Sequence, residues 1–300
     1  MAAGGQQRGI AIPFAVALAG IGVFSTMDAV MKGLALSIGA YNALLWRTLA
    51  GALLGGAVFL LRRMPWPRGR ALRMHLVRGS LSSIMAVLFF WGLARVPMAQ
   101  AIALAFIAPL VALYLAALWL KEKIRRRAVL ASLLGFAGVA VILAGQARAE
   151  LGPEAMMGSA AILLSASLYA ANIILMRAQA QVAGPVEVAF FMSAIMSACF
   201  LVAAPVLAVF PAAAEWPAIV AAALLAFASL MLLAWAYARA EAQHLAPTEY
   251  SGFVWAAFYG WLIFAEPVRP FTLAGAAMIV GACLVAARTR LPAEHAEGAL

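Results

Sequence analysis

The chain has 300 residues, of which 67% are hydrophobic and 11% are charged, and it carries a formal net charge of +10. A soluble domain is about half apolar and about a quarter charged, and single hydrophobic cores stop growing at roughly 250–300 residues. The excess of apolar residues therefore excludes a soluble globular protein and predicts a polytopic membrane protein.

Ten apolar runs approach the length of about 20 residues that a membrane-spanning helix needs. The first follows a single basic residue, Arg8, as a signal peptide would, but it is too long for the core of a signal peptide. The connections between runs are short, so we expect an all-α integral membrane protein with ten transmembrane helices. In chain order the expected spans are 10–33, 40–61, 74–94, 97–119, 128–146, 155–177, 185–209, 217–238, 246–264 and 269–288.

The basic residues are distributed unequally between the two sides of this arrangement. With the N-terminus inside, fifteen of the 21 lysine and arginine residues fall in inner segments, whereas only Arg95, Arg148 and Arg269 fall in outer loops. Cytoplasmic loops retain basic residues. The distribution predicts a multi-pass protein of the cell inner (cytoplasmic) membrane with both termini cytoplasmic, and it explains the positive charge without a nucleic-acid partner.

The two halves of the chain share polar residues at one constant offset. The stretches LARVPMAQAIALAF and YARAEAQHLAPTEY have an Ala-Arg pair in the same frame, 144 residues apart. The same offset places Asp28 on Asn172 and Glu122 on Glu266. Repeats of this kind decide an architecture, so we expect two homologous halves.

Each half contains five expected spans, and an odd number means that the second half enters the membrane upside down. The predicted domains are a first five-helix repeat at 1–147, a second, inverted five-helix repeat at 152–290 and a flexible C-terminal tail at 291–300. Inverted repeats are typical of secondary transporters, because two packings exchanged between symmetric halves open a central site to alternate sides. The expected function is therefore alternating-access transport.

Each half also has a Glu just before a last span rich in small residues. These stretches are Pro109 followed by LVALYLAALWLK and Glu122, and IFAEP followed by RPFTLAGAAMIVG. Over nearly the whole chain this arrangement resembles the EamA type of the drug/metabolite transporter superfamily. One departure is that Phe253 stands at the counterpart of Pro109, so the fourth and ninth spans need not bend alike. The resemblance implies a central cavity between the halves, with the fifth and tenth helices at the periphery.

Members of this superfamily export amino acids and other metabolites or drugs, and some import compounds such as riboflavin or S-adenosylmethionine. We favour a small organic metabolite, an amino acid or a similar zwitterionic or amphipathic solute, because acidic and basic groups lie at one depth. A cofactor-like import substrate and a lipid-linked substrate for a flippase are the alternatives. The sequence lacks HExxH, GxSxG and Gly-rich phosphate motifs, so we expect neither an enzyme nor a cofactor. The sequence leaves open whether transport is coupled to a proton, and whether the protein is a monomer or a homodimer.

The stretch FSTMDAVMK puts charged residues inside the first span. Asp28 and Lys32 are four residues apart, hence on one helix face. Arg47 in the second span lies at a similar depth, roughly 10 Å below the external end. One interpretation is a structural Asp28–Arg47 ion pair, with Lys32 reaching the external interface. The other is that all three line the cavity and hold the charged ends of a zwitterion, since ionisable residues within spans mark function by default.

Other polar residues within spans are weaker candidates for the substrate site. Asn172, the counterpart of Asp28, either forms a hydrogen bond between helices or contacts the ligand. Glu249 is either a gate or proton site, or a residue that reaches cytoplasmic water. We expect Arg78 to snorkel to the cytoplasmic side, and Glu266 with Glu122 to cap helices or contact the other repeat. The remaining candidates for the cavity wall are Trp91, Gln100, Tyr114, Tyr169, Trp235, Tyr250 and Trp255.

Small residues and prolines predict where helices approach closely or bend. Glycine pairs let transmembrane helices pack at short distance, and a proline within a span removes a backbone hydrogen bond. The two cysteines fall in apolar runs and suggest neither a disulfide nor a metal site. The residues concerned are the pairs Gly51–Gly55, Gly135–Gly138 and Gly275–Gly281, the prolines Pro109 and Pro205, and Cys199 and Cys283.

Overall fold

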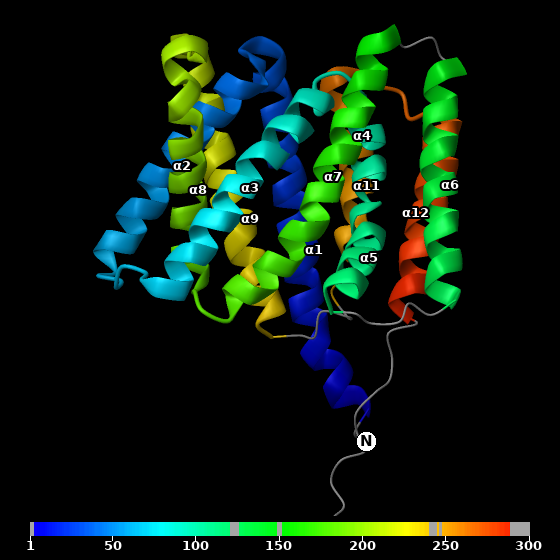
Figure 1. The fold of residues 1–300 in the computed structure, drawn as a ribbon, viewed down its shortest axis with the longest axis horizontal. Helices are drawn as coiled ribbons and strands as arrows, with labels where there is room; N and C mark the ends of the chain where they lie inside the picture. Colours follow the sequence, from blue (N-terminus) through cyan, green and yellow to red (C-terminus); the bar gives the residue numbers. More distant parts are fainter. Residues whose placement is uncertain (1–2, 121–125, 149–151, 240–244, 246–247, 289–300) are drawn as a thin grey trace, which may run out of the picture.

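The computed structural model describes residues 3–120, 126–148, 152–239, 245 and 248–288, and no strand occurs in these ranges. Glu122 and the expected tail at 291–300 lie outside the described residues. The helices form a bundle (Figure 1). They are α1 (Ala3–Ser37), α2 (Gly39–Leu61), α3 (Gly69–Leu93), α4 (Met98–Ala105), α5 (Ala108–Leu120), α6 (Arg126–Arg148), α7 (Gly152–Ala180), α8 (Pro185–Leu207), α9 (Trp216–Tyr237), α11 (Ser251–Phe264) and α12 (Pro270–Arg288), with a short 3₁₀ turn η1 (Ala213–Glu215) before α9.

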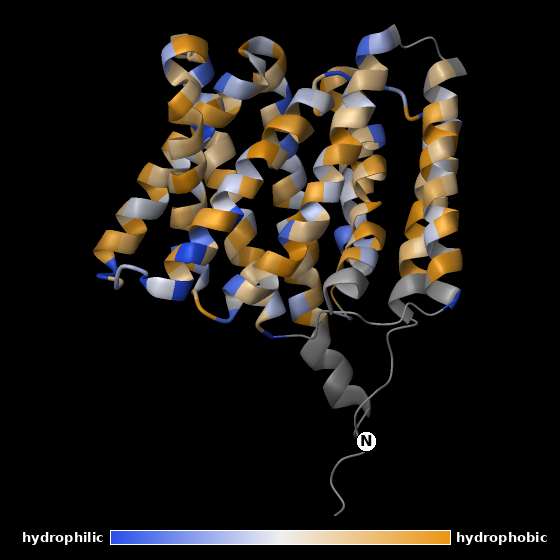
Figure 2. Ribbon diagram, in the orientation of Figure 1, coloured by the Kyte–Doolittle hydropathy of each residue, from blue (hydrophilic) through white to orange (hydrophobic). Residues whose placement is uncertain are grey.

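The surface of the bundle is matched to lipid. Six helices in the described part of the chain, namely α1, α2, α3, α7, α8 and α9 (the last counted together with η1), are long and apolar enough to cross a membrane. The shorter apolar segments are Met98–Ala112, Ser132–Gly145, Ser251–Phe264 and Pro270–Val285. Hydrophobic residues predominate along the helices (Figure 2), and side chains such as Leu61 and Val206 are more than 80% exposed. Large apolar surfaces of this extent are not tolerated in water, so the chain is a multi-pass membrane protein.

The fourth expected span is interrupted, as a proline in it predicted. α4 ends at Ala105 and α5 begins at Ala108, directly before Pro109. At the break the backbone N–H of Ile107 donates to Leu104 and that of Leu110 donates to Ile107, so the chain tightens to three-residue bonds. Proline disfavours the helical conformation of the residue before it and lacks a donor of its own. Pro205 behaves differently from our expectation of a mid-span bend, because it lies in the last turn of α8.

Equivalent helices of the two halves make equivalent contacts. α1 packs on α9 as α7 packs on α3, and α2 contacts α9 as α8 contacts α3. The pairs α2–α8 and α6–α12 each join a helix to its own counterpart. In Figure 1 the α6–α12 pair lies at one edge of the bundle and the α2–α8 pair at the other. The helices of the fifth and tenth expected spans, α6 and α12, therefore occupy the peripheral place that the family resemblance implied.

The close approach of α6 and α12 depends on glycines, which have no side chain. A Cβ atom at Gly138 would lie 2.7 Å from the carbonyl oxygen of Gly275, and one at Gly275 would lie 2.5 Å from that of Gly138. At the α2–α8 contact, a Cβ at Gly55 would lie 3.0 Å from the Cα of Phe190. Gly281 does not belong to this set, contrary to our expectation, since no atom lies within 4 Å of its added Cβ. The spacing of small residues does not specify which face of a helix they occupy.

The buried core occupies the centre of the bundle. Its fully buried side chains come from helices of both halves, including Met31 of α1, Leu44 of α2, Leu104 of α4, Ile162 of α7 and Ile219 of α9. The charged residues of α1 and α2 are therefore set in an apolar environment, where each polar group needs a partner.

Candidate functional site

Asp28 and Arg47 lie inside the bundle with polar atoms that have no partner. Asp28 on α1 is 2% exposed, and Arg47 on α2 is half-buried. Asp28 Oδ1 and Arg47 Nε are both buried and make no hydrogen bond. The two charges attract one another, but within the described residues they form no direct ion pair. Of the two interpretations that the sequence left open, a direct Asp28–Arg47 ion pair is therefore not formed, because no oxygen of Asp28 lies within ion-pair distance of an Arg47 nitrogen.

Buried polar atoms without a hydrogen bond are rare in folded proteins, where the great majority of buried polar groups are hydrogen-bonded. Leaving a buried group unsatisfied costs about 1–3 kcal/mol, and more when it is charged. Asp28 therefore offers an acceptor and Arg47 a donor to any molecule that reaches them. A ligand with a cationic and an anionic group would satisfy both at once.

Lys32 lies buried at one end of the bundle, where protein groups hold its ammonium. It is 2% exposed, forms an ion pair with Glu266 Oε1, and donates to the carbonyl oxygen of Val96 at 2.8 Å. Glu266 accepts a second bond through Oε2 from the backbone N–H of Met98 at 2.8 Å. Glu266 thus caps the start of α4, in the capping role expected of it. The ion pair with Lys32 was missed, since 234 residues separate the partners and no sequence pattern links them.

Arg78 also stays inside the protein rather than snorkelling to its surface. It is 9% exposed, its Nε donates to Asn172 Oδ1 at 3.1 Å, and its Nη1 donates to Gln179 Oε1. The Gln179 amide nitrogen then contacts His75 Nδ1 at 2.8 Å, and His75 Nε2 contacts Glu187 Oε1 at 2.8 Å. Our expectation failed because buried amides on α7 satisfy the guanidinium where it stands.

The direction of these bonds determines the tautomer of His75. The amide oxygen of Gln179 accepts from Arg78, so the amide nitrogen faces His75 and donates to Nδ1. A nitrogen that accepts carries no proton, so the proton lies on Nε2 and is donated to Glu187. The chain of five side chains therefore connects α3, α7 and α8 as one polar network at the end of the bundle opposite to Lys32.

Aromatic residues of α11 pack against α1 at Gly22 and Thr26. The hydroxyl groups of Tyr259 and Thr26 are 2.7 Å apart, and the ring of Trp255 stacks on that of Tyr259 with centroids 6.2 Å apart. An added Cβ at Gly22 would lie 3.2 Å from the Trp255 ring. The sequence prediction named Trp255 but missed Tyr259 and Thr26, whose hydroxyls are the polar groups of this contact. Both hydroxyls were visible in the sequence, but their pairing depends on the α1–α11 packing.

A second group of predicted residues gathers at the Arg78 end. Tyr237 donates its hydroxyl to Glu249 Oε1 at 2.8 Å, and Tyr169 interacts electrostatically with both Glu249 and Arg78. Tyr169 is 38% exposed. Tyr237 is a residue that sequence reasoning missed. Its only signal was its position at the end of a span, which equally suits an interfacial residue.

Two of the predicted tryptophans pair with an arginine one turn further along the same helix. The Arg95 guanidinium lies 3.7 Å from the ring centroid of Trp91, and that of Arg239 lies 4.1 Å from Trp235. Each of the two rings therefore has a stabilising cation–π partner on its own helix.

Of the last three predicted residues, Gln100 and Tyr250 also have neighbours other than Asp28 and Arg47. Gln100, buried on α4, donates to Ser159 Oγ at 3.2 Å, and Tyr250 packs edge-on against Phe106 with centroids 5.4 Å apart. Tyr114 is half-buried on α5. The structure thus distributes the predicted residues over separate contacts, and the two buried atoms without a hydrogen bond, Asp28 Oδ1 and Arg47 Nε, lie on α1 and α2.

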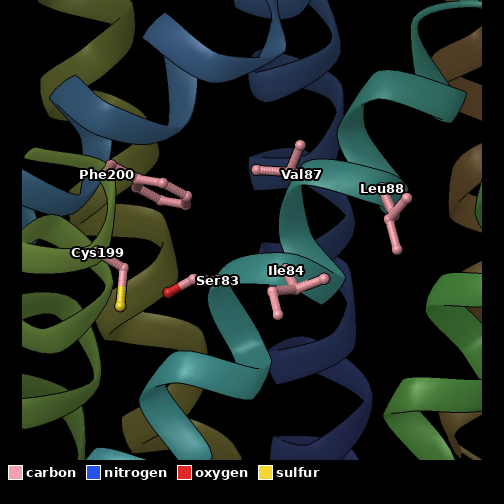
Figure 3. Close-up of a pocket in the computed structure, with 6 residues that line it drawn as sticks. All are labelled: Ser83, Ile84, Val87, Leu88, Cys199 and Phe200. Atoms are coloured by element: carbon pink, nitrogen blue, oxygen red, sulfur yellow. The ribbon is translucent and has the colours of Figure 1, made fainter. Parts of the chain in front are cut away.

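A pocket of about 330 Å³ lies between α3 and α8 (Figure 3). Its wall is apolar except for Ser83, whose hydroxyl already donates to the carbonyl of Gly79 at 2.9 Å. None of the predicted site residues lines it, and it offers no charge to a polar solute. Within the described residues, no group of three or more His, Cys, Asp or Glu side chains could hold a metal ion. The pocket is lined by Ser83, Ile84, Val87, Leu88, Cys199 and Phe200.

Comparison with known proteins identifies relatives over almost the whole chain. The model of the EamA-like transporter family matches twice, at residues 11–144 and 156–288. The pseudopaline exporter CntI of Pseudomonas aeruginosa, in strains UCBPP-PA14 and PAO1, is 30% identical over 276 residues, covering 89% of this chain and 93% of the relative. A crystal structure of an otherwise undescribed protein superposes with a TM-score of 0.63 at 20% identity, over 95% of this chain and 99% of the other. This last likeness bears on the fold alone.

Proposed function

Since the chain belongs to the EamA-like transporter family, we propose that it moves a small zwitterionic organic solute across the membrane by alternating access. Family membership makes the protein a transporter, and the charge pattern of the substrate is our inference from the site. The favoured substrates are amino acids and solutes of similar charge. Pseudopaline, the compound in the name of the CntI relative, belongs in the same first set of compounds to be tested.

The observation that carries this proposal is the pair of unpartnered atoms, Asp28 Oδ1 and Arg47 Nε. In the complex, Asp28 accepts from the ammonium group of the substrate and Arg47 donates to its carboxylate. Charge-assisted bonds of this type are about twice as strong as neutral ones. They also repay part of the cost of keeping both charges inside the membrane, which an empty site leaves uncompensated.

The architecture we propose for transport is ten spans in two inverted five-helix repeats. Three observations support it: the constant offset of polar residues between the halves, the double family match, and helix contacts that recur when the halves are exchanged. The excess of basic residues in the inner segments supports cytoplasmic termini in an inner membrane. One chain then encloses a complete site, so a monomer suffices for transport. A coupling proton, if used, would be carried by Asp28.

Counterflow in proteoliposomes tests the function. Vesicles containing the purified protein are loaded with unlabelled amino acids or pseudopaline, and accumulation of the radiolabelled compound from outside is followed. We expect accumulation with a zwitterionic solute and a strong loss with Asp28→Asn and with Arg47→Gln. Glu154→Gln and Arg62→Gln are the matched controls, since both residues are exposed. Normal counterflow by both Asp28→Asn and Arg47→Gln would leave these residues a purely structural role.

A further inference from the structure

We infer that Lys32 exchanges one carboxylate partner for another during transport, pairing with Glu266 when the external end is closed and with Asp28 when it is open. The inference rests on the proposed function and gives it a release step. In the open state, the Lys32 ammonium takes the place that the cationic group of the substrate occupied on Asp28.

The structure shows Lys32 paired with Glu266, the arrangement that we assign to the closed state. The Lys32 ammonium is held by Glu266 and by the carbonyl of Val96, and it lies 5.1 Å from the ring centroid of Phe264. Glu266 also binds the backbone N–H of Met98. One ion pair, between the buried Lys32 and the partly buried Glu266, therefore ties α1 and the start of α4, both in the first half, to the turn after α11 in the second half. Separation of the two halves at this end breaks the pair.

The turn that carries Glu266 is built to aim its side chain at this position. Ala265 adopts left-handed φ of 52°, a conformation that non-glycine residues keep only where their surroundings impose it. The backbone N–H of Glu266 then donates back to Gly260 at 2.9 Å. An added Cβ at Gly260 would lie 3.0 Å from Glu266 Oε2. The carboxylate thus lies directly over a residue without a side chain, which leaves it room to reach Met98.

When Glu266 moves away, Lys32 needs another partner, because an isolated ammonium is costly in a medium of low dielectric constant. Asp28 is the carboxylate one turn earlier on the same helix, and residues four apart face one another. Long side chains on a helix lean toward its N-terminus, hence from Lys32 toward Asp28. Asp28 Oδ1 has no partner in the closed state. Because both residues belong to α1, they stay together however the halves move.

The exchange couples the gate to the site. Asp28 cannot pair fully with the Lys32 ammonium and with a substrate ammonium at the same time, so opening of the external end weakens substrate binding and favours release on that side. Closing returns Lys32 to Glu266 and frees Asp28 for the next substrate molecule. Such coupling requires an element with two states whose equilibrium both sites shift, and Lys32 with its two alternative partners is that element.

The test compares binding of one radiolabelled zwitterionic amino acid by the wild type and three variants in detergent. Glu266→Gln keeps the shape of the side chain but releases Lys32, so we expect its affinity to fall by about tenfold, within the usual range of coupling between sites. Lys32→Gln removes the competitor, so it should bind more tightly than the wild type and release labelled solute more slowly. The double variant should recover the affinity that Glu266→Gln lost. Glu154→Gln, which changes an exposed carboxylate, is the control.

The outcomes separate this inference from the proposed function. If the wild type binds no zwitterionic solute, the proposed function fails and the exchange fails with it. If the wild type binds but Glu266→Gln binds equally well, or the double variant does not recover, only the exchange is overturned. Weaker binding by Lys32→Gln alone would also overturn it, since that result makes Lys32 a substrate ligand. Should Glu266→Gln not fold, the Lys32→Gln variant decides by itself.

Discussion

Arg78 donates from Nε to the amide oxygen of Asn172 at 3.1 Å, and Asn172 stands at the position equivalent to Asp28 in the second half of the chain. The halves thus use equivalent positions differently. In the second half the polar group is neutral and already bonded, whereas in the first half it is an acid with an unpartnered oxygen. This asymmetry concentrates the charged chemistry on α1 and α2.

Removal of the Asn172 amide is expected to destabilise the protein. Asn172→Ala leaves Arg78 Nε buried without its partner, which costs about 1–3 kcal/mol of the free energy of unfolding. In mixed detergent micelles, the variant should therefore unfold at a lower denaturant concentration than the wild type. The control is Ser167→Ala on the same helix, because the Ser167 hydroxyl bonds only to the carbonyl of Leu163 one turn away. Equal stability of the two variants would show that the Arg78 network does not hold α3 to α7.

The α6–α12 contact predicts a sharp difference between two glycines. Gly138→Ala places a methyl group 2.7 Å from the Gly275 carbonyl oxygen and 2.8 Å from Ile279 Cγ1, so we expect a loss of about 1–3 kcal/mol from overpacking. Gly281→Ala meets no atom within 4 Å and should leave stability unchanged or slightly raised. Thermal unfolding of both purified variants measures the difference. Similar behaviour would contradict the helix pairing described above.

The two cysteines should differ in their reaction with a thiol reagent. Cys283 is 4% exposed and its thiol lies 3.4 Å from the carbonyl oxygen of Phe106, whereas Cys199 is half-buried at the pocket between α3 and α8. N-ethylmaleimide added to the folded protein in detergent should therefore modify Cys199 first. Mass spectrometry of the intact protein and of Cys199→Ser locates the adduct. Rapid labelling of Cys199→Ser would mean that Cys283 is accessible.

Much of the fold follows from local sequence, because spans are decided by composition and length. α1 to α3 and α6 to α9 overlap the expected runs, and the break before Pro109 follows from the chemistry of proline. The family resemblance implied that the fifth and tenth spans are peripheral, and α6 and α12 do lie at one edge of the bundle (Figure 1). These features depend on residues near one another in the chain or on a repeated pattern.

The contacts of the charged residues did not follow in this way. Sequence spacing puts Asp28 and Lys32 on one helix face, but it gives no information on the rotation of α1 against α2 or α11. Lys32 therefore pairs with Glu266, and Asp28 remains without the arginine expected for it. Arg78 could not be placed correctly either, because its partners on α7 lie about 100 residues away in the chain. Only packing between helices determines these neighbours.

The central claim is that Asp28 and Arg47 hold the two charged ends of one solute, and calorimetric titration of the purified protein tests it most directly. The titrants are a zwitterionic amino acid bound by the wild type, the corresponding amine without the carboxylate, and the corresponding acid without the amine. We predict that the wild type prefers the zwitterion to both analogues by about tenfold or more, as a charged hydrogen bond of about 1.5–3 kcal/mol implies. Asp28→Asn should lose the preference over the acid, and Arg47→Gln the preference over the amine. If both variants keep the wild-type preferences, the two residues do not bind the substrate.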